Sequence, residues 1–178
     1  MFARNGIHKT SIRAVAAAAG VDSALVHHYY GTKERLFAAA VHIPIDPNDV
    51  LDRLREVPVE RLGHTLPSLL LPLWDSEIGA GMTATLRSIL AGGSEVNLFR
   101  AFLQEVIADE VGARVDHPPG SGVIRIQFVA SQLVGVAMAR YVIELEPFAS
   151  LPIQQIADTI APNLQRYLTG DLPHWPAP

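Results

Sequence analysis

Two histidines and two tyrosines stand side by side at residues 27–30, where they could bind a metal, act as acid or base, or contact a large partner. Neighbouring residues on a helix point about 100° apart, so His27 and His28 cannot coordinate one metal ion together. Two histidines four residues apart on the same helix face could do so. A third ligand is not nearby in the sequence. The pattern therefore predicts neither a metal site nor a cofactor.

Enzyme chemistry has little support elsewhere in the chain. The sequence has no cysteine, which removes thiol nucleophiles, disulfides and Cys-ligated zinc together. Its motifs include no GxSxG nucleophile elbow, no GxxxxGK[ST] phosphate loop and no HExxH zinc motif. Gly79, Gly81, Gly92 and Gly93 follow expected helices rather than strands, which argues against a dinucleotide loop. We therefore expect a protein that is not an enzyme.

The charge of the chain is unevenly distributed. Residues 1–45 carry five Lys or Arg and two acids, a net charge of +3, whereas the remainder carries nine arginines and sixteen acids, a net charge of −7. Both lysines of the chain, Lys9 and Lys33, lie in the first segment. Only that segment is electrostatically suited to a polyanion.

Neither a membrane span nor a signal peptide is expected. The most apolar stretch, residues 126–143, contains polar residues that do not suit a span of about 20 apolar residues, namely Gln127, Ser131, Gln132 and Arg140. Charged residues among the first nine interrupt any apolar signal region. The sequence predicts a cytoplasmic protein without a membrane partner.

The order of helices divides the chain into two parts. Residues 43–49, IPIDPND, contain two prolines that must end a helix, so we expect one domain over 1–45 and another over 46–178. Apolar residues recur at spacings of three and four residues, as on one face of a helix, which predicts an all-α protein. The expected helices span residues 11–19, 23–30, 33–42, 50–55, 59–74, 77–90, 96–115, 122–145 and 153–168. Pro67, Pro72 and Pro162 should kink or shorten their helices.

Capping residues mark the first three helices. Thr10 or Ser11, then Asp22, then Thr32 stand where a side-chain oxygen would accept an unpaired amide of the first turn. Gly20 and Gly31 follow the first two helices, as a left-handed closing residue would.

The first two helices form a helix-turn-helix pattern. Ile12, Val15, Ala16 and Ala19 share one face of the first helix, and Val26 and Tyr30 form the inner face of the second. Other side chains of the second helix then face outwards, as DNA recognition requires. Thr32 and Lys33 open the next helix, whose free amides and lysine suit a phosphate.

The stretch FARNGIHKTSIRAVAAAAGVDSALVHHYYGTKERLF, residues 2–37, resembles the DNA-binding domain of the tetracycline-repressor-like (TetR/AcrR) transcriptional regulators. LVGVAMARYVIELEP and IAPNLQRYLTG, residues 133–147 and 160–170, resemble the regulatory domain of the same family. The resemblance implies a homodimeric repressor that binds a near-palindromic double-stranded DNA operator and leaves it when a small-molecule effector binds. It also implies that the effector moves the helix after Lys33 and so changes the distance between the two DNA-binding domains.

Matching positions carry the family's DNA contacts onto this chain. The resemblance places paired hydroxyls and an arginine near phosphates, a base-reading start on the second helix, and aromatic or histidine side chains behind it. The expected DNA-binding residues are Thr10, Ser11, Arg13, Ser23, Ala24, Leu25, His27, His28, Tyr29, Thr32 and Lys33. Tyr30 matches a buried aromatic. In the family, a lysine is frequent at the position that Ser23 occupies here, and a small or polar residue at the position of Leu25. Base reading by this chain should therefore depend on methyl contacts and hydroxyls.

The family pattern begins with a longer first helix, of which FARNG matches only the last turn. We expect further residues upstream. Without them, the face formed by Ile12, Val15 and Phe37 should be exposed.

The second domain is less specific. Candidates for an effector pocket are His64, Trp74, Met82, Phe99 and Phe102, although such residues at helical spacing are often plain core. The helix at 122–145 is apolar or small on most faces and should be buried on most faces. With the last helix it resembles the family's dimer interface, which predicts contacts by Gln127, Ser131, Val134, Gly135, Met138, Ile160 and Leu164. The alternative is an all-α ligand-binding or scaffold protein that uses the helix-turn-helix for subunit contact.

Overall fold

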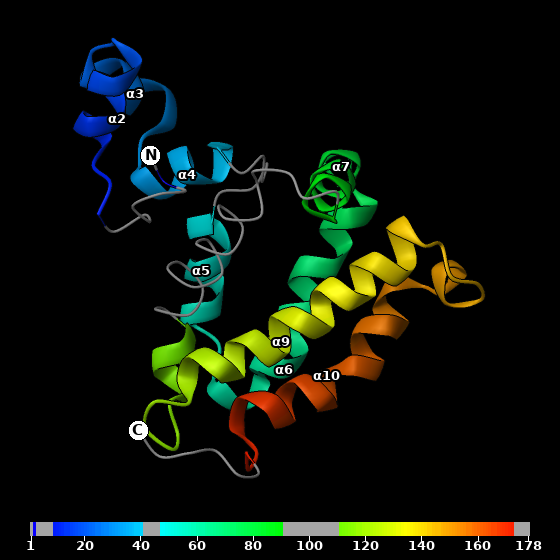
Figure 1. Cartoon of the computed structure of the whole chain (residues 1–178). Helices are drawn as coiled ribbons and strands as arrows, with labels where there is room; N and C mark the ends of the chain where they lie inside the picture. The colour runs from blue at the N-terminus through cyan, green and yellow to red at the C-terminus, as the bar shows by residue number, and fades with distance from the viewer. Residues whose placement is uncertain (1, 3–8, 41–46, 91–110, 173–178) are drawn as a thin grey trace.

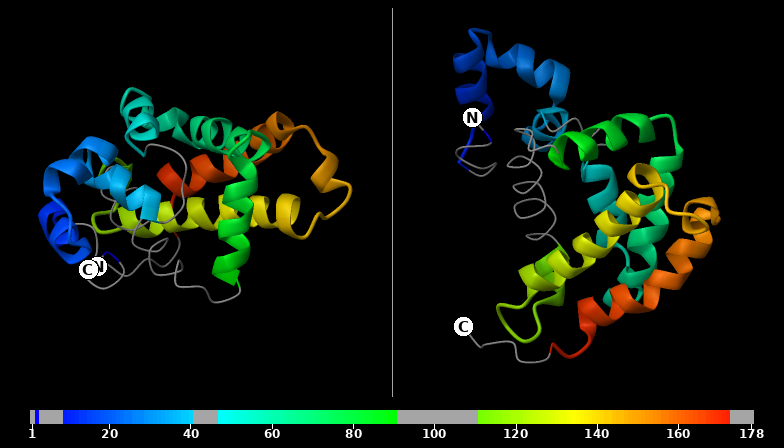
Figure 2. Two further views of the ribbon diagram at one scale, coloured as in Figure 1. Left: turned by 90° about the horizontal axis from the view of Figure 1, so that it is seen from above. Right: turned by 45° about the vertical axis from the view of Figure 1, so that its right-hand side comes forward.

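The structure, a computed structural model, describes residues 2, 9–40, 47–90 and 111–172, and all regular elements in these ranges are helical. A small N-terminal group of helices stands apart from a larger helical bundle, and α5 lies between them (Figure 1). The view turned by 45° about the vertical axis shows the same separation (Figure 2, right). The expectation of an all-α fold is therefore confirmed.

The N-terminal helices begin where their caps predict. Ser11, Asp22 and Thr32 each accept a backbone amide two or three residues later, at 3.1, 2.7 and 3.2 Å respectively. Gly20 closes the first helix in the left-handed conformation, with φ of 69°. These local signals fix α2 (Ile12–Ala19), α3 (Ser23–Tyr30) and α4 (Lys33–Ala40).

The core of this domain differs from the sequence expectation. Ile12 and Phe37 are buried, at 8% and 0% exposure, and Val15 is half-buried, so the predicted exposed face is wrong. Phe2, itself 6% exposed, contributes to this burial: its ring meets Phe37 edge to face with centroids 5.1 Å apart. The aromatic residue of FARNG therefore covers the Phe37 part of this face.

Two residues expected on the inner faces of the helix-turn-helix lie outside. Val26 is buried against α2, but Tyr30 is 38% exposed and Ala19 is exposed. Both are the last residues of short helices, and the contact between α2 and α3 is made by residues such as Ala16 and Val26, nearer the middle of each helix. The spacing of the apolar residues identified the correct inner side of each helix. It did not indicate that the contact between α2 and α3 ends before the last residue of each helix.

The C-terminal domain is a bundle in which α6 and α10 form the most extensive contact and α9 packs beside α10. Its elements are α5 (Pro47–Arg55), η1 (Val59–Arg61), α6 (Leu62–Leu70), η2 (Leu71–Asp75), α7 (Gly79–Leu90), η4 (Ala113–Val115), α9 (Gly122–Ala137), η5 (Met138–Val142), η6 (Phe148–Ser150) and α10 (Ile153–Thr169). The expected helix at 96–115 lies largely outside the described residues, and the expected domain boundary between residues 45 and 46 lies outside them as well.

Prolines change the helices less than expected. The α-helical run ends at Leu70 and continues as the 3₁₀ turn η2, whose second residue is Pro72. Pro67 and Pro162 lie inside α6 and α10 without ending them. The expected helix at 122–145 is α-helical to Ala137 and closes with the π-helical turn η5.

Glycine lets α6 and α10 approach each other closely. A Cβ added to Gly63 would lie 2.4 Å from the backbone nitrogen of Gln165. The Gly63 amide donates to Gln165 Oε1 at 2.9 Å, and Gln165 Nε2 donates to the Val59 carbonyl at 3.1 Å. One glutamine of α10 thus holds the start of α6 in place.

Candidate nucleic-acid interface

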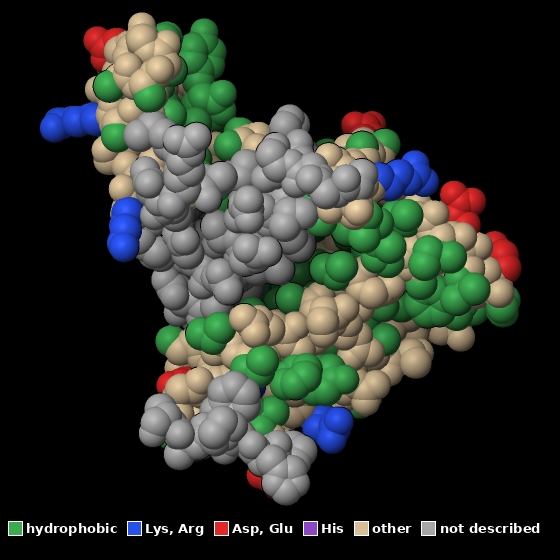
Figure 3. Space-filling model, in the orientation of Figure 1, with side chains coloured by type: hydrophobic (Ala, Val, Ile, Leu, Met, Phe, Trp, Pro, Cys, Tyr) green, Lys and Arg blue, Asp and Glu red, His purple; other side chains and the backbone are tan. Residues whose placement is uncertain are grey.

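The outer face of α3 is open to solvent. Ala24, Leu25, His28 and Tyr29 are exposed, Tyr29 most of all at 74%, while Ser23 is half-buried. The imidazole of His28 meets the Tyr29 ring edge to face, with centroids 5.4 Å apart. Cationic side chains project from the outer edge of this domain (Figure 3). The face thus combines aromatic and methyl groups with positive charge nearby, which suits a DNA groove.

His27 is exposed but already has a partner within the chain. Its Nδ1 lies 3.1 Å from the carbonyl oxygen of Gly31, the residue that closes α3 with a positive φ of 69°. A carbonyl can only accept, so Nδ1 is the donor and carries the hydrogen. His27 therefore holds the turn between α3 and α4 and has only Nε2 left for DNA.

The start of α4 carries the residues from which a phosphate site is predicted. The hydroxyl of Thr32 caps the helix by accepting the Arg35 amide, and the half-buried Lys33 follows at the first helical position. Free amides and the positive dipole end of a helix favour an anion there.

At the start of α2 the two hydroxyls behave differently. Ser11 is exposed and caps the helix, and Arg13 is exposed two residues further along. Thr10 is 2% exposed, so its predicted phosphate contact is wrong. It precedes the cap by one residue and its side chain turns into the domain.

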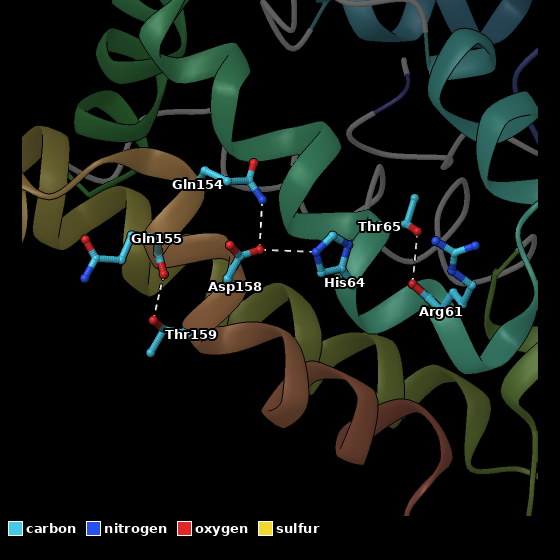
Figure 4. Close-up of polar contacts among 7 residues, drawn as sticks. All are labelled: Arg61, His64, Thr65, Gln154, Gln155, Asp158 and Thr159. Atoms are coloured by element: carbon cyan, nitrogen blue, oxygen red, sulfur yellow. Dashed lines mark hydrogen bonds and ion pairs between the residues drawn. The ribbon is translucent and has the colours of Figure 1, made fainter.

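Of the five predicted effector-pocket residues, the structure describes three: His64, Trp74 and Met82. His64 lies on the surface, where its Nε2 is 3.2 Å from Asp158 Oδ1 on α10, and Asp158 also accepts from Gln154 (Figure 4). Its assignment to a pocket is therefore wrong, because it faces a neighbouring helix at the outer edge of the bundle. Trp74 is half-buried and stacks on Tyr141, and Met82 is half-buried on α7. Phe99 and Phe102 lie outside the described residues.

The predicted dimer residues fall into two groups. Gln127, Ser131 and Gly135 are exposed along α9, and Val134 and Met138 beside them are half-buried. A Cβ added to Gly135 would meet nothing within 4 Å. In Figure 3, hydrophobic side chains gather over α9 and α10 on the lower face.

Ile160 and Leu164 do not belong to this surface. Their exposures are 8% and 0%, because this side of α10 packs into the core of the chain itself. The exposed residues of α10 include Thr159 and Asn163 instead.

Three arginines whose roles the sequence did not indicate bind backbone carbonyls. Arg125, 2% exposed, donates from Nη1 to the carbonyls of Tyr167 and Gly170 at 2.8 and 2.9 Å, and from Nη2 to that of His117. Burial lowers the pKa of its guanidinium. It thereby closes the C-terminal end of α10, where carbonyls lack helical partners.

Arg140 is the second of the three arginines that bind backbone carbonyls. Its Nη1 donates to the carbonyls of Ala149 and Leu151 at 2.7 and 2.6 Å, and its Nη2 lies 3.5 Å from Asp75 Oδ2. The hydroxyl of Tyr141 donates to the other oxygen of Asp75 at 2.8 Å. Burial and this hydrogen bond raise the pKa of Tyr141 to about 12.

Among the described residues, one helix has the length and composition of a membrane span, and no cluster of metal ligands is found. In the described ranges, no three His, Asp or Glu side chains are placed to hold an ion together. Residues 122–142 are long and apolar enough to cross a membrane by length and composition, which corrects the expectation that this stretch is too polar. Both Arg125 and Arg140, however, bind carbonyls of the surrounding domain from this stretch, as fits a helix inside a folded bundle.

The fold and the outward-facing second helix define a two-domain, all-α protein with a helix-turn-helix. Two family models match the chain. The model described as "Tetracyclin repressor-like, C-terminal domain" matches residues 60–168. The model described as "Bacterial regulatory proteins, tetR family" matches residues 1–40. The chain therefore belongs to the TetR family of bacterial transcriptional regulators.

Two proteins of Streptomyces coelicolor are similar to the chain. A helix-turn-helix-type transcriptional repressor is 38% identical over 65 residues, which are 30% of this chain and 34% of the repressor. The matched region thus spans about a third of the length of that relative. The crystal structure of a TetR-family regulator is 28% identical, with 94% of this chain and 87% of the other covered and a TM-score of 0.41.

Proposed function

We propose that the protein is a homodimeric repressor that binds a near-palindromic DNA operator and releases it when a small molecule binds the C-terminal domain. The observation that carries the proposal is the exposed face of α3, with Leu25, His28 and Tyr29 outward and Lys33 at the start of the next helix. The similar Streptomyces coelicolor protein is described as a transcriptional repressor, which supports the direction of regulation. A protein of this kind acts in the cytoplasm.

Each part of the face has a role in this proposal. Leu25 and Ala24 place methyl groups where a thymine methyl can meet them, and Ser23 offers a hydroxyl to a base edge. Tyr29 and His28 extend along the groove wall. Lys33, Ser11 and Arg13 contact phosphates and fix the position of α3 without reading sequence.

Binding of a duplex selected from random DNA tests the DNA contacts. Lys33→Ala should weaken binding to all sequences and reduce the salt slope by about 1, and Tyr29→Ala should also weaken binding. Arg53→Ala removes the same charge from an exposed site on α5 and is the matched control. The proposal fails if Lys33→Ala and Tyr29→Ala bind as the unsubstituted protein does at low salt.

The proposed dimer uses the exposed side of α9 around Gln127, Ser131 and Gly135, with Thr159 and Asn163 of α10 beside it. A two-fold dimer would present two α3 helices to half-sites about 34 Å apart, or a multiple of that distance. Gly135→Leu places a bulky side chain on this surface and should yield monomers in sedimentation. Gly81→Leu, at an exposed glycine of α7 with similar free space, is the control and should remain dimeric. A Gly135→Leu protein that sediments as a dimer would refute this interface.

The effector site is proposed for the interior of the C-terminal domain, with Trp74 and Met82 as its remaining described candidates. Binding of effector and of operator must oppose each other by the same factor. A thermal-shift screen of small molecules, followed by titration of each hit against the protein–DNA complex, tests this. A hit that stabilises the protein but leaves its DNA affinity unchanged is not the effector.

A further inference from the structure

The third carbonyl-binding arginine, Arg114, joins two parts of the chain that lie far apart in sequence. Its Nη1 donates to the Leu54 carbonyl at 2.6 Å, and its Nη2 donates to the Val57 carbonyl. Leu54 is in the last turn of α5, and Val57 lies two residues beyond its end. The Leu54 carbonyl also accepts the Val57 amide at 3.2 Å, and both carbonyls lie near the C-terminal end of α5, the negative end of its dipole. A planar guanidinium fork fixes their direction as well as their distance.

Arg114 itself is firmly attached to the start of α9. It lies in η4, just after Gly112, whose backbone oxygen would be 2.3 Å from a Cβ on Gly122. Asp116 Oδ1 accepts the Gly122 amide at 2.7 Å. Close backbone contact and a charged cap thus hold η4 against the first turn of α9.

The same end of α9 is also tied to α10. Arg125, one turn into α9, binds the His117 carbonyl between η4 and α9 and the carbonyls at the end of α10. Segment 111–122, the start of α9 and the end of α10 are therefore linked by one set of directional bonds. The same two helices, α9 and α10, carry the proposed dimer surface.

The other partner of α5 is the DNA-binding domain. α5 contacts α4, and α4 follows the recognition helix after the turn that His27 closes. In Figure 1, α5 runs between the N-terminal helices and the bundle. A tilt of α5 about its C-terminal end would therefore displace α4 and α3.

Apolar packing alone leaves such a tilt poorly defined. The inner side of α5 presents Leu51 and Leu54, at 4% and 1% exposure, and hydrophobic contact is not directional. The two bonds from Arg114 are directional, and two carbonyls held in fixed directions at the C-terminal end of α5 limit how the helix can rotate about that end.

We infer that Arg114 is a positioning residue that sets the tilt of α5, and hence where the recognition helix stands relative to the α9–α10 dimer surface. The inference rests on the proposed function, because position matters only if two recognition helices must meet two half-sites. It assigns Arg114 no contact with DNA or with the effector.

The spacing of the two half-sites provides the test. Arg114→Met keeps most of the side-chain stem and removes the fork. We expect its affinity for the duplex selected by the unsubstituted protein to fall about tenfold, which corresponds to about 1.4 kcal/mol. Its affinity for duplexes with one base pair inserted or removed between the half-sites should fall less, so that discrimination between spacings weakens. The salt slope should not change, because no phosphate contact is lost.

Two further variants separate positioning from loss of fold. Arg114→Lys keeps the charge and one donor group, and should recover part of the spacing discrimination; it also serves if Arg114→Met does not fold. Arg53→Met, an equal change at an exposed site of α5, should behave as the unsubstituted protein.

The outcomes are distinct. Unchanged spacing discrimination in Arg114→Met, or in Arg114→Lys when only that variant folds, overturns the inference while the proposed function stands. A salt slope reduced by about 1 also overturns it, because Arg114 would then be a phosphate contact. If the unsubstituted protein selects no DNA, the proposed function and the inference fall together.

Discussion

Replacement of Gly63 by alanine tests the closest helix contact in the C-terminal domain. The added methyl carbon would lie 2.4, 2.5 and 2.6 Å from the backbone nitrogen, Cβ and Cα of Gln165. Carbon atoms in good contact lie about 3.5–4.0 Å apart, so α6 and α10 must separate by roughly 1 Å. The backbone of Gln165 cannot turn aside as a side-chain end would.

The cost can be estimated from three contributions. Overpacking of this kind destabilises by about 1–3 kcal/mol. Separation also stretches the bonds from the Gly63 amide to Gln165 and from Gln165 to the Val59 carbonyl, each worth about 1 kcal/mol. Alanine gains up to about 1 kcal/mol over glycine in a helix. We expect Gly63→Ala to lower the free energy of unfolding by about 2 kcal/mol.

Denaturant unfolding, followed by circular dichroism at one fixed protein concentration, measures this change. Gly81→Ala is the matched control, since a Cβ there meets nothing within 4 Å and the same substitution should stabilise by about 0.5–1 kcal/mol. The two variants should therefore shift the midpoint in opposite directions. A Gly63→Ala protein as stable as the unsubstituted one would show that α6 and α10 do not pack as closely as described.

Two ionisable groups give pH-dependent predictions. Because the fold raises the pKa of Tyr141 to about 12, the stabilising contribution of its hydroxyl is complete below about pH 10 and is lost as pH rises through 12. Tyr141→Phe should therefore lower the free energy of unfolding by about 1 kcal/mol at neutral pH. In a series of measurements at rising pH, the free energy of unfolding of this variant should fall less steeply than that of the unsubstituted protein. Backbone hydrogen bonds from Gly120 and Gly122 lower the pKa of Asp116, so its contribution is present above about pH 4 and is lost as pH falls through the folded value. Asp116→Asn should flatten the acid side of the thermal-stability profile, and an unchanged profile would contradict this assignment.

The sequence was most informative where structure is decided locally. Ser11, Asp22 and Thr32 predicted the starts of three helices because a cap bonds an amide only two or three residues away. The outer face of α3 followed from the same local order. Thr10 shows the limit of this reasoning, because a shift of one residue at a cap separates an exposed hydroxyl from a buried one.

Contacts between distant segments were harder to predict. Periodicity gave an apolar side for α10 but could not tell whether a second copy or the chain itself covers Ile160 and Leu164. His27 and His64 each have a partner that their residue type does not specify. The carbonyl-binding roles of Arg114, Arg125 and Arg140 left no signal, because every residue offers a backbone carbonyl and the partners are set only by the fold.

These carbonyl clamps also affect how the molecule meets DNA electrostatically. Three of the nine arginines after residue 45 direct their charge at helix ends and turns inside the domain, whereas the carboxylates that the structure describes there are largely exposed. The net charge of this domain stays at −7, but its outer surface carries a larger share of negative groups than the count of charged residues indicates. Repulsion from this half would orient the molecule as it approaches a polyanion, so that the helix-turn-helix end arrives first.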